Sequence, residues 1–228
     1  MTLVRRTFLK GSAAVLATSL LPLDAALADA KRQALVDDAL EAARKVLNEK
    51  EYPDAVRLMA KSKAVLIVPQ LVQGGFIFGA AGGRGALLVR SNPGSWSHPA
   101  FYTMGSGSFG LQIGGKVSEI VFIILTDKGL HALLESKFKF GAEAGVTLVA
   151  IGTSVEGATT AAAGADIVAY ARSTGLFAGA SLEGSYIDPD NDWNAMYYGT
   201  GANPRTIALE RRFTNPGAER LRQFLGRW

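Results

Sequence analysis

The sequence predicts an α+β fold, in which a glycine-rich, mostly antiparallel sheet is strongly curved or closed into a barrel-like sandwich. Of the 26 glycines in the 228 residues, 23 lie between Gly74 and Gly201 and separate short apolar segments. Some of these segments alternate, as from Phe138 to Leu148, with the period of a half-buried strand. Apolar residues at helical spacing add an N-terminal, an internal and a C-terminal helix.

The apolar segments between the glycines are the expected strands. They are Phe76–Ala80, Gly85–Arg90, Phe101–Met104, Phe109–Ile113, Val117–Leu125, Phe140–Ile151, Asp166–Arg172 and Leu176–Ile187. The run Ile120–Leu125 is apolar at every position, which predicts a central strand covered on both faces. The pairs Gly74-Gly75, Gly82-Gly83 and Gly114-Gly115 are expected to form positive-φ turns or bulges between strands.

The segment Lys31–Glu51 has the pattern of one amphipathic helix, which Pro53 ends. Apolar residues recur in it at helical spacing: Val36, Leu40, Ala43 and Leu47. Its acidic and basic residues balance, so we expect the helix to pack on the domain, and membrane contact is the alternative. A second, short helix at about Asp54–Ser62 leads into the apolar strand Ala64–Pro69.

Capping signals predict two further helices. Thr126 or Asp127 caps the internal helix. The apolar face of that helix carries Leu130, Leu133 and Leu134. The last helix starts at Asn215-Pro216, where a capping residue is followed by proline at the first helical position.

The N-terminus carries the three regions of an export signal. Arg5-Arg6 is a twin-arginine pair, the run Gly11–Leu23 is weakly apolar, and small-x-small cleavage sites follow at Ala26-Leu27-Ala28 and Ala28-Asp29-Ala30. The apolar run is shorter than the roughly 20 residues that span a bilayer, which favours cleavage over a membrane anchor. We therefore expect a twin-arginine signal peptide over residues 1–28, an amphipathic helix over 29–53, one domain over 54–228, and a periplasmic location.

Composition excludes several classes of function. The formal net charge of +4 falls to about +2 without the signal residues, too small a basic excess for a nucleic-acid-binding protein. The chain has no cysteine, which excludes disulfides, thiolate metal sites and cysteine nucleophiles. Its two histidines, His98 and His131, lie far apart in sequence, so a zinc site is not expected.

Three catalytic or ligand-binding patterns match only in part. Gly105-x-Gly107-x-x-Gly110 has dinucleotide-binding spacing but is followed by a strand pattern instead of a helix. Ser136-x-x-Lys139 has no partner motifs for an acyl-enzyme. In Asp188–Asp192, the calcium-loop spacing lacks its glycine and its glutamate, so we expect a solvated turn between strands, with weak calcium binding as the alternative. We therefore predict no enzyme activity, no metal and no cofactor.

The C-terminal segment is the best candidate for a binding surface. Its expected lipid contacts are Arg211, Arg212, Arg220, Arg222, Phe224 and Trp228. A basic helix with an aromatic end is typical of an element that lies in a lipid headgroup layer, and arginine pairs with phosphate through two hydrogen bonds. In the alternative interpretation, the apolar stripe of Ala218, Leu221, Leu225 and Trp228 docks onto the sheet and the arginines are solvated.

In order along the chain, the glycine-strand segments resemble the SYLF family, also called the Ysc84-like or lipid-binding SYLF domain. The resemblance covers about Ala64–Ala208 and rests on an ordered set of segments, none of which is diagnostic by itself. These are Ala64–Pro69, Gly74–Gly79, Gly82–Gly85, Trp96–Phe101, Gly105–Gly114, Tyr170–Ser181 and Tyr197–Gly199.

The resemblance implies a non-enzymatic domain that binds membrane lipids, notably phosphoinositides in eukaryotic members, and actin in some fungal ones. For an exported bacterial chain, the expected partner is then an anionic phospholipid surface of the cell envelope, contacted by a peripheral membrane protein. Two alternatives stay open: a carrier that encloses an acyl chain in the curved sheet, and an envelope assembly protein that acts through a protein partner not identified by the sequence.

Overall fold

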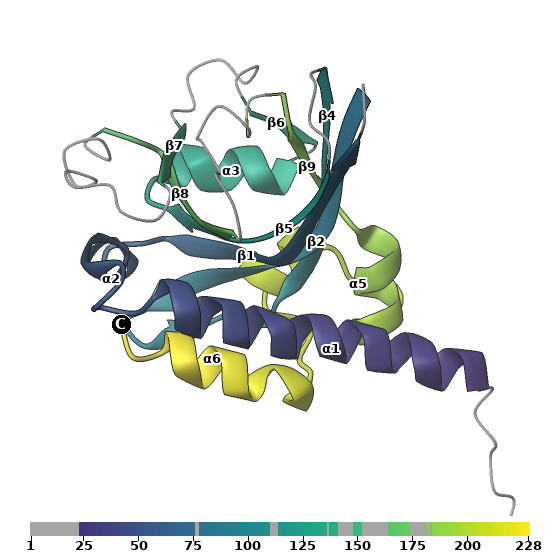
Figure 1. Cartoon of the computed structure of the whole chain (residues 1–228). Helices are drawn as coiled ribbons and strands as arrows, with labels where there is room; N and C mark the ends of the chain where they lie inside the picture. The colour runs from purple at the N-terminus through teal and green to yellow at the C-terminus, as the bar shows by residue number, and fades with distance from the viewer. Residues whose placement is uncertain are drawn as a thin grey trace, which may run out of the picture.

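The computed structural model describes residues 23–75, 78–109, 114–135, 137–140, 148–151, 164–173, 182 and 184–228. It has a curled sheet with helices on both faces, which confirms the predicted α+β class (Figure 1). The sheet has nine strands in the order β6-β9-β4-β2-β1-β5-β8-β7, with β3 paired to β2. Every strand pair is antiparallel except β7 with β8, as expected for a mostly antiparallel sheet.

The bounds of the strands follow the glycine-separated segments only in part. The strands are β1 (Ala64–Gly75), β2 (Phe78–Asn92), β3 (Ser95–Trp96), β4 (Ala100–Phe109), β5 (Gly114–Ile124), β6 (Phe138–Lys139), β7 (Leu148–Ile151), β8 (Ile167–Ser173) and β9 (Tyr186–Pro189). Gly105 and Gly107 both lie inside β4, whereas Gly110, the third glycine of the dinucleotide-like spacing, lies outside the described residues. Ser136 and most of the segments expected at Phe140–Ile151 and Leu176–Ile187 lie outside the described residues.

Strand β5 is the central strand that the sequence predicted. It pairs with β1 on one side and β8 on the other. Val121 and Ile123 face one core cluster, whereas Ile120 and Phe122 face the other, and all four are buried. From Ile120 to Ile124 the strand has a core on each face and no solvent-facing position, which is why this part of its sequence is apolar without alternation.

The pair Gly82-Gly83 does not form the expected turn or bulge. It lies within β2, which joins the two segments predicted as separate strands, and Gly82 and Gly83 pair with Val72 and Leu71 of β1. The irregularity lies instead in β1, where Pro69 has no N–H to donate and the register with β2 shifts between Ile67 and Gln70.

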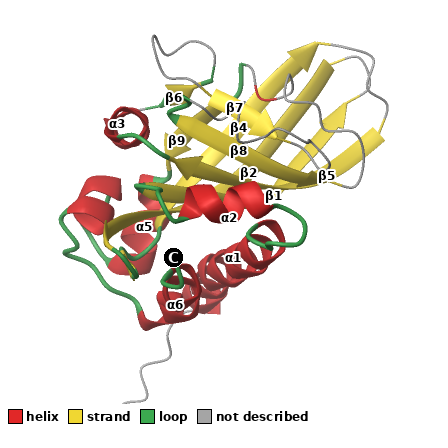
Figure 2. Ribbon diagram, turned by 90° about the vertical axis from the view of Figure 1, so that its left-hand side faces the viewer, coloured by secondary structure: helices red, strands yellow, loops and turns green. Residues whose placement is uncertain are grey.

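The helices sort onto the two faces of the sheet (Figures 1 and 2). They are α1 (Leu23–Val46), α2 (Pro53–Met59), α3 (Asp127–Glu135), α5 (Asn191–Tyr198) and α6 (Glu219–Leu225), with a π-helical turn η2 (Arg205–Leu209) and a 3-10 turn η3 (Pro216–Ala218). Side chains of α1, α2 and α6 enter one core cluster, while those of α3 and η2 enter the other. Among the described helices, none combines the length and the apolar character needed to cross a bilayer.

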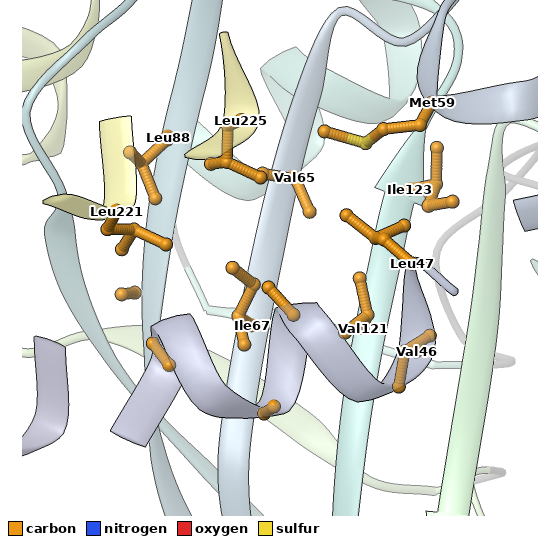
Figure 3. Close-up of a cluster of buried hydrophobic side chains, with 14 of the residues drawn as sticks. Val46, Leu47, Met59, Val65, Ile67, Leu88, Val121, Ile123, Leu221 and Leu225 are labelled. Carbon is orange, nitrogen blue, oxygen red and sulfur yellow. The ribbon is translucent and has the colours of Figure 1, made fainter. Parts of the chain in front are cut away.

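Helix α1 packs on the domain as expected. Val36, Leu40, Ala43 and Leu47 are all buried, and they share a core cluster with sheet residues such as Val121. Figure 3 shows this cluster, in which α1 and α6 pack side by side against β1, β2 and β5. The helix ends at Val46, earlier than the predicted Glu51, and α2 begins at Pro53.

The predicted caps of the internal and last helices are confirmed. Thr126 Oγ1 accepts a hydrogen bond from the Gly129 N–H (3.1 Å) at the start of α3. The Asn215 side chain accepts from the Gly217 N–H (2.9 Å) at the start of η3, which continues into α6. The apolar residues predicted for the internal helix, Leu130, Leu133 and Leu134, are buried.

The acidic segment Asp188–Asp192 is not a turn between strands. Its first residues end β9, Asp190 accepts a hydrogen bond from the Trp193 N–H (3.1 Å), and α5 follows. Asp190 also pairs with Arg84 (2.9 Å). The sequence analysis did not predict this helix, although its cap is a recognisable signal, an aspartate followed by further polar residues in the first turn.

Candidate functional site

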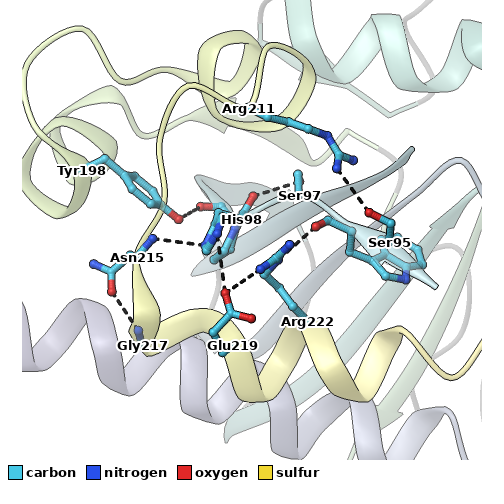
Figure 4. A network of polar contacts seen from close by, with 11 residues as sticks. Ser95, Ser97, His98, Tyr198, Arg211, Asn215, Gly217, Glu219 and Arg222 are labelled. Carbon is cyan, nitrogen blue, oxygen red and sulfur yellow. Dashed lines mark hydrogen bonds and ion pairs between the residues drawn. The ribbon is translucent and has the colours of Figure 1, made fainter. Parts of the chain in front are cut away.

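The C-terminal segment and the end of β3 enclose an open pocket of about 430 Å³. Its lining residues are Trp96, Ser97, His98, Arg211, Thr214, Pro216, Glu219 and Arg222. The chain brings them together because η3 and α6 pack beside β3 after a long excursion through α5 and η2 (Figure 4). The pocket therefore combines residues more than a hundred positions apart in the sequence.

Arg222 projects from α6 toward β3. Its Nε donates to the Trp96 carbonyl oxygen (3.0 Å), and its Nη1 donates to Glu219 Oε1 (2.5 Å). The side chain is 26% exposed, so part of the guanidinium still faces the pocket and solvent. The backbone contact holds the cation in one orientation whether or not Glu219 stays in place.

Arg211 approaches the same pocket from the other side. Its Nη2 donates to the Val89 carbonyl oxygen (3.2 Å), an uncharged acceptor. Burial, and after it the charge of Arg222, lower the pKa of Arg211 below its usual value. Arg211 has a φ of 55°, and it is the one non-glycine residue of the described chain with positive φ. This uncommon backbone conformation thus occurs at a residue whose guanidinium lies in the pocket.

His98 lines the pocket between the two arginines and α6. The ring is nearly buried, and its Nδ1 accepts the backbone N–H of Asn215 (3.2 Å), which leaves the proton of the neutral ring on Nε2. Nε2 faces Glu219 Oε1 at 3.7 Å. Burial first, then the charge of Arg222, lower the pKa of His98, although Glu219 acts in the opposite direction.

The pocket is electrostatically positive. Arg211 and Arg222 face it together with a titratable histidine, and the single carboxylate among the lining residues is Glu219. Two guanidiniums held by uncharged carbonyl oxygens in one recess form a site suited to an oxyanion such as a carboxylate or a phosphate.

The six residues expected to bind lipid divide into three pairs. Arg211 and Arg222 line the pocket. Arg212 and Arg220 are exposed outside it, and only Arg212 has an acidic partner among the described residues, Glu210 at 3.5 Å. These four arginines form the arginine surface of the C-terminal segment.

Phe224 and Trp228, the third pair, face the protein. Phe224 is 7% exposed and contacts the Trp228 ring edge to face, with 5.3 Å between centroids. Both pack against the core cluster that α1, α6 and the sheet share. In this conformation the apolar stripe of α6 docks onto the domain, as the alternative interpretation of the C-terminal segment predicted.

Sequence reasoning missed the other half of the pocket. The sequence analysis did not assign Trp96, His98 and Glu219 to the site, and it considered His98 only as a zinc ligand. No local spacing connects His98 to Asn215, because their contact spans 117 positions. The available signal was weak: a tryptophan and a histidine two positions apart, next to two serines.

Comparison with known proteins identifies the family. A family model described as Ysc84, Las17-binding protein actin regulator, matches residues 105–228. Protein YSC84 of Saccharomyces cerevisiae is 30% identical over 76% of this chain and 37% of its own length. LAS seventeen-binding protein 3 of the same species is 31% identical over 74% of this chain, again covering 37% of its own.

A human relative, SH3 domain-containing YSC84-like protein 1, is 30% identical over 67% of this chain and 45% of its own length. The chain thus spans less than half the length of these relatives. The matched region 105–228 includes α5, η2, η3 and α6, and with them the arginine surface. The chain belongs to the Ysc84 (SYLF) family of non-enzymatic binding domains.

Proposed function

We propose that this protein is a non-enzymatic, exported phospholipid-binding protein that attaches peripherally to an anionic membrane of the bacterial cell envelope. The observation that carries the proposal is the arrangement of Arg211 and Arg222 around a pocket whose lining holds one carboxylate. Arg212 and Arg220 extend this positive region onto the exposed surface. Anionic headgroups present many phosphate oxyanions in one plane, which a set of arginines on one segment can contact together.

The attachment is electrostatic, without insertion of aromatic side chains. Phe224 is buried in the core, so its entry into lipid would require α6 to leave the domain. Each basic side chain near an anionic surface contributes about 1 kcal/mol, and salt weakens this contribution. We therefore expect binding that rises with the content of anionic lipid and falls with ionic strength.

Vesicle sedimentation tests this function with a charge-reversed variant and a matched control. We expect Arg212→Glu combined with Arg220→Glu to abolish binding to vesicles of phosphatidylglycerol in phosphatidylcholine at low salt. The control, Lys128→Glu with Lys139→Glu, changes the net charge equally on exposed residues of α3 and of the edge strand β6, neither of which lines the pocket. An equal loss of vesicle binding in both variants would mean that binding depends on net charge and not on this surface. Vesicle binding that is insensitive to acidic lipid and to salt would refute the proposal.

A protein partner is the second candidate, because relatives are named for binding LAS seventeen and for regulating actin. It predicts no vesicle binding by the wild type at any lipid composition. Crosslinking in cells would then give a defined complex, and the same arginine variant would report whether that complex uses this surface.

Export by the twin-arginine route is part of the proposal. Residues 1–22 lie outside the described residues, while the two cleavage sites fall in the first turns of α1. Residues 29–31 are exposed and Arg32 is the first buried residue after the cleavage sites, so cleavage after Ala28 retains every residue of α1 whose burial the structure describes. We expect Arg5→Lys with Arg6→Lys to retain the precursor in the cytoplasm, as fractionation and N-terminal sequencing would show; export of this variant at the wild-type rate would refute the route.

A further inference from the structure

We infer that Glu219 is an internal counter-ion of the pocket, and that a phosphate oxyanion binds there by displacing the Glu219 carboxylate. The inference rests on the proposed function, since it takes the same pocket as the point of contact, and it adds the ligand class and a built-in competitor. The phosphate group could be the monoester of a lipid headgroup or a free ion, because both present at least three oxygens and more than one negative charge at neutral pH.

The position of Glu219 is that of an acidic ligand. Its Oε1 lies 2.5 Å from Arg222 Nη1 and 3.7 Å from His98 Nε2. One oxygen thus contacts a fixed cation and a ring N–H that both face the pocket. An incoming phosphate oxygen at this place would meet the same two donors.

Glu219 can leave without damage to the core. Its side chain projects from the start of α6 toward the pocket and is 42% exposed, so solvent can reach it. Rotation of the side chain breaks one partly exposed ion pair, which contributes on the order of 1 kcal/mol or less to stability. The buried residues of the segment, Ala218 and Leu221, stay in place during this movement.

The cations do not depend on Glu219 for their positions. Arg222 keeps its hydrogen bond to the Trp96 carbonyl oxygen, and Arg211 keeps its bond to that of Val89. Both guanidiniums are therefore preorganised for a ligand, which lowers the entropy cost of binding. The Thr214 hydroxyl, also on the lining, offers an uncharged donor.

A phosphate outcompetes the carboxylate by charge and by shape. A phosphate monoester carries a charge of about −1.5 to −2 at neutral pH and has three acceptor oxygens, against a charge of −1 and two oxygens for glutamate. A phosphate can contact both Arg211 and Arg222, whereas the Glu219 carboxylate accepts a hydrogen bond from Arg222 and not from Arg211. The pair with Glu219 lowers the apparent affinity by the amount of a partly exposed ion pair, about two- to fivefold.

The test compares Glu219→Gln with Glu210→Gln. Each variant removes one negative charge from an acid of the C-terminal segment that pairs with an arginine, but Glu210 pairs with Arg212 outside the pocket. We expect Glu219→Gln to bind inorganic phosphate about two- to fivefold more tightly than the wild type, and Glu210→Gln to bind it like the wild type. The readout is the NMR ring signal of His98, assigned with His131→Gln, since the chain has two histidines.

A loss variant completes the design. Arg211→Gln should remove the response of His98 to phosphate, because it takes one of the two guanidiniums from the pocket. Urea unfolding of every variant verifies that the pocket is formed when phosphate is added. An unchanged phosphate affinity in Glu219→Gln, an equal gain in Glu210→Gln, or a full response in Arg211→Gln would overturn the inference.

Vesicles separate the failure of the inference from that of the proposed function. The same variants are sedimented with phosphatidylcholine vesicles containing either phosphatidic acid, a monoester, or phosphatidylglycerol. Vesicle binding without a His98 response to phosphate leaves the peripheral function standing and refutes the pocket as its site. A response to inorganic phosphate without vesicle binding assigns the pocket to a free phosphate and refutes the membrane function instead.

Discussion

Asn194 of α5 satisfies both backbone groups of Phe101 on β4 through a single side-chain amide. Its Oδ1 accepts the Phe101 N–H (2.7 Å), and its Nδ2 donates to the Phe101 carbonyl oxygen (3.1 Å). Asn194 is fully buried. The amide makes the hydrogen bonds that a neighbouring strand would make, and it anchors α5, the helix that the sequence analysis did not predict.

Replacing Asn194 tests this anchor. Asn194→Ala leaves the buried Phe101 N–H without a partner, so we expect the free energy of unfolding to fall by about 2–3 kcal/mol. Asn191→Ala, in the same helix but exposed, should change it by less than about 0.5 kcal/mol. Urea titration measures both; equal effects of the two substitutions would contradict the anchoring role.

Adjacent glycines of β2 should respond differently to alanine. A Cβ at Gly83 would lie under 3.0 Å from the Gln70 carbonyl oxygen, beside the irregularity in β1, whereas a Cβ at Gly82 would meet nothing within 4 Å. We expect Gly83→Ala to lower the free energy of unfolding by about 1–3 kcal/mol, and Gly82→Ala to change it by less than about 0.5 kcal/mol. Thermal unfolding measures the difference; a tolerated Gly83→Ala would show that β1 and β2 can separate at this point.

His98 should make stability depend on pH. Because burial and Arg222 lower its pKa below 6.5 in the folded protein, the unfolded chain takes up this proton first on acidification. The free energy of unfolding is therefore undiminished above about pH 6.5, and it falls as the pH drops from there toward the lowered pKa. We expect a smaller fall in His98→Gln, measured by urea unfolding from about pH 5 to 8.

The matched control for this pH dependence is His131→Gln, which removes an exposed histidine of α3 far from the pocket. It should retain the wild-type profile. A His98→Gln profile that parallels the wild type would assign the acid sensitivity to other groups.

Docking of α6 can be tested at Leu225. This residue is fully buried in the cluster of α1, α6 and the sheet (Figure 3). Leu225→Ala leaves a cavity there, and we expect it to lower the free energy of unfolding by about 2–5 kcal/mol. The exposed neighbour Gln223→Ala serves as the control. A loss below about 1 kcal/mol at Leu225 would mean that α6 is only loosely attached in solution.

The sequence predicted correctly those features of the secondary structure that depend on neighbouring residues. Helical spacing located the apolar faces of α1 and α3, and capping residues such as Thr126 and Asn215 marked where helices begin. The uniform apolar run of β5 predicted a strand between two cores. The prediction at Gly82-Gly83 was wrong, because glycine permits both a turn and the close approach of two strands. Only the pairing of these glycines with β1 distinguishes the two cases.

By itself the sequence determined the α+β class, the family, and the concentration of arginine in the last segment. It could not say which of those arginines meet, since a one-dimensional pattern treats Arg211 and Arg212 alike. The tertiary structure decided that Arg211 and Arg222 share a pocket with His98 while Arg212 and Arg220 face solvent. It also placed Phe224 in the core. The physical reason is that burial and electrostatic coupling depend on distances across the fold, and the contacts of β3 with α6 join residues more than a hundred positions apart in the sequence.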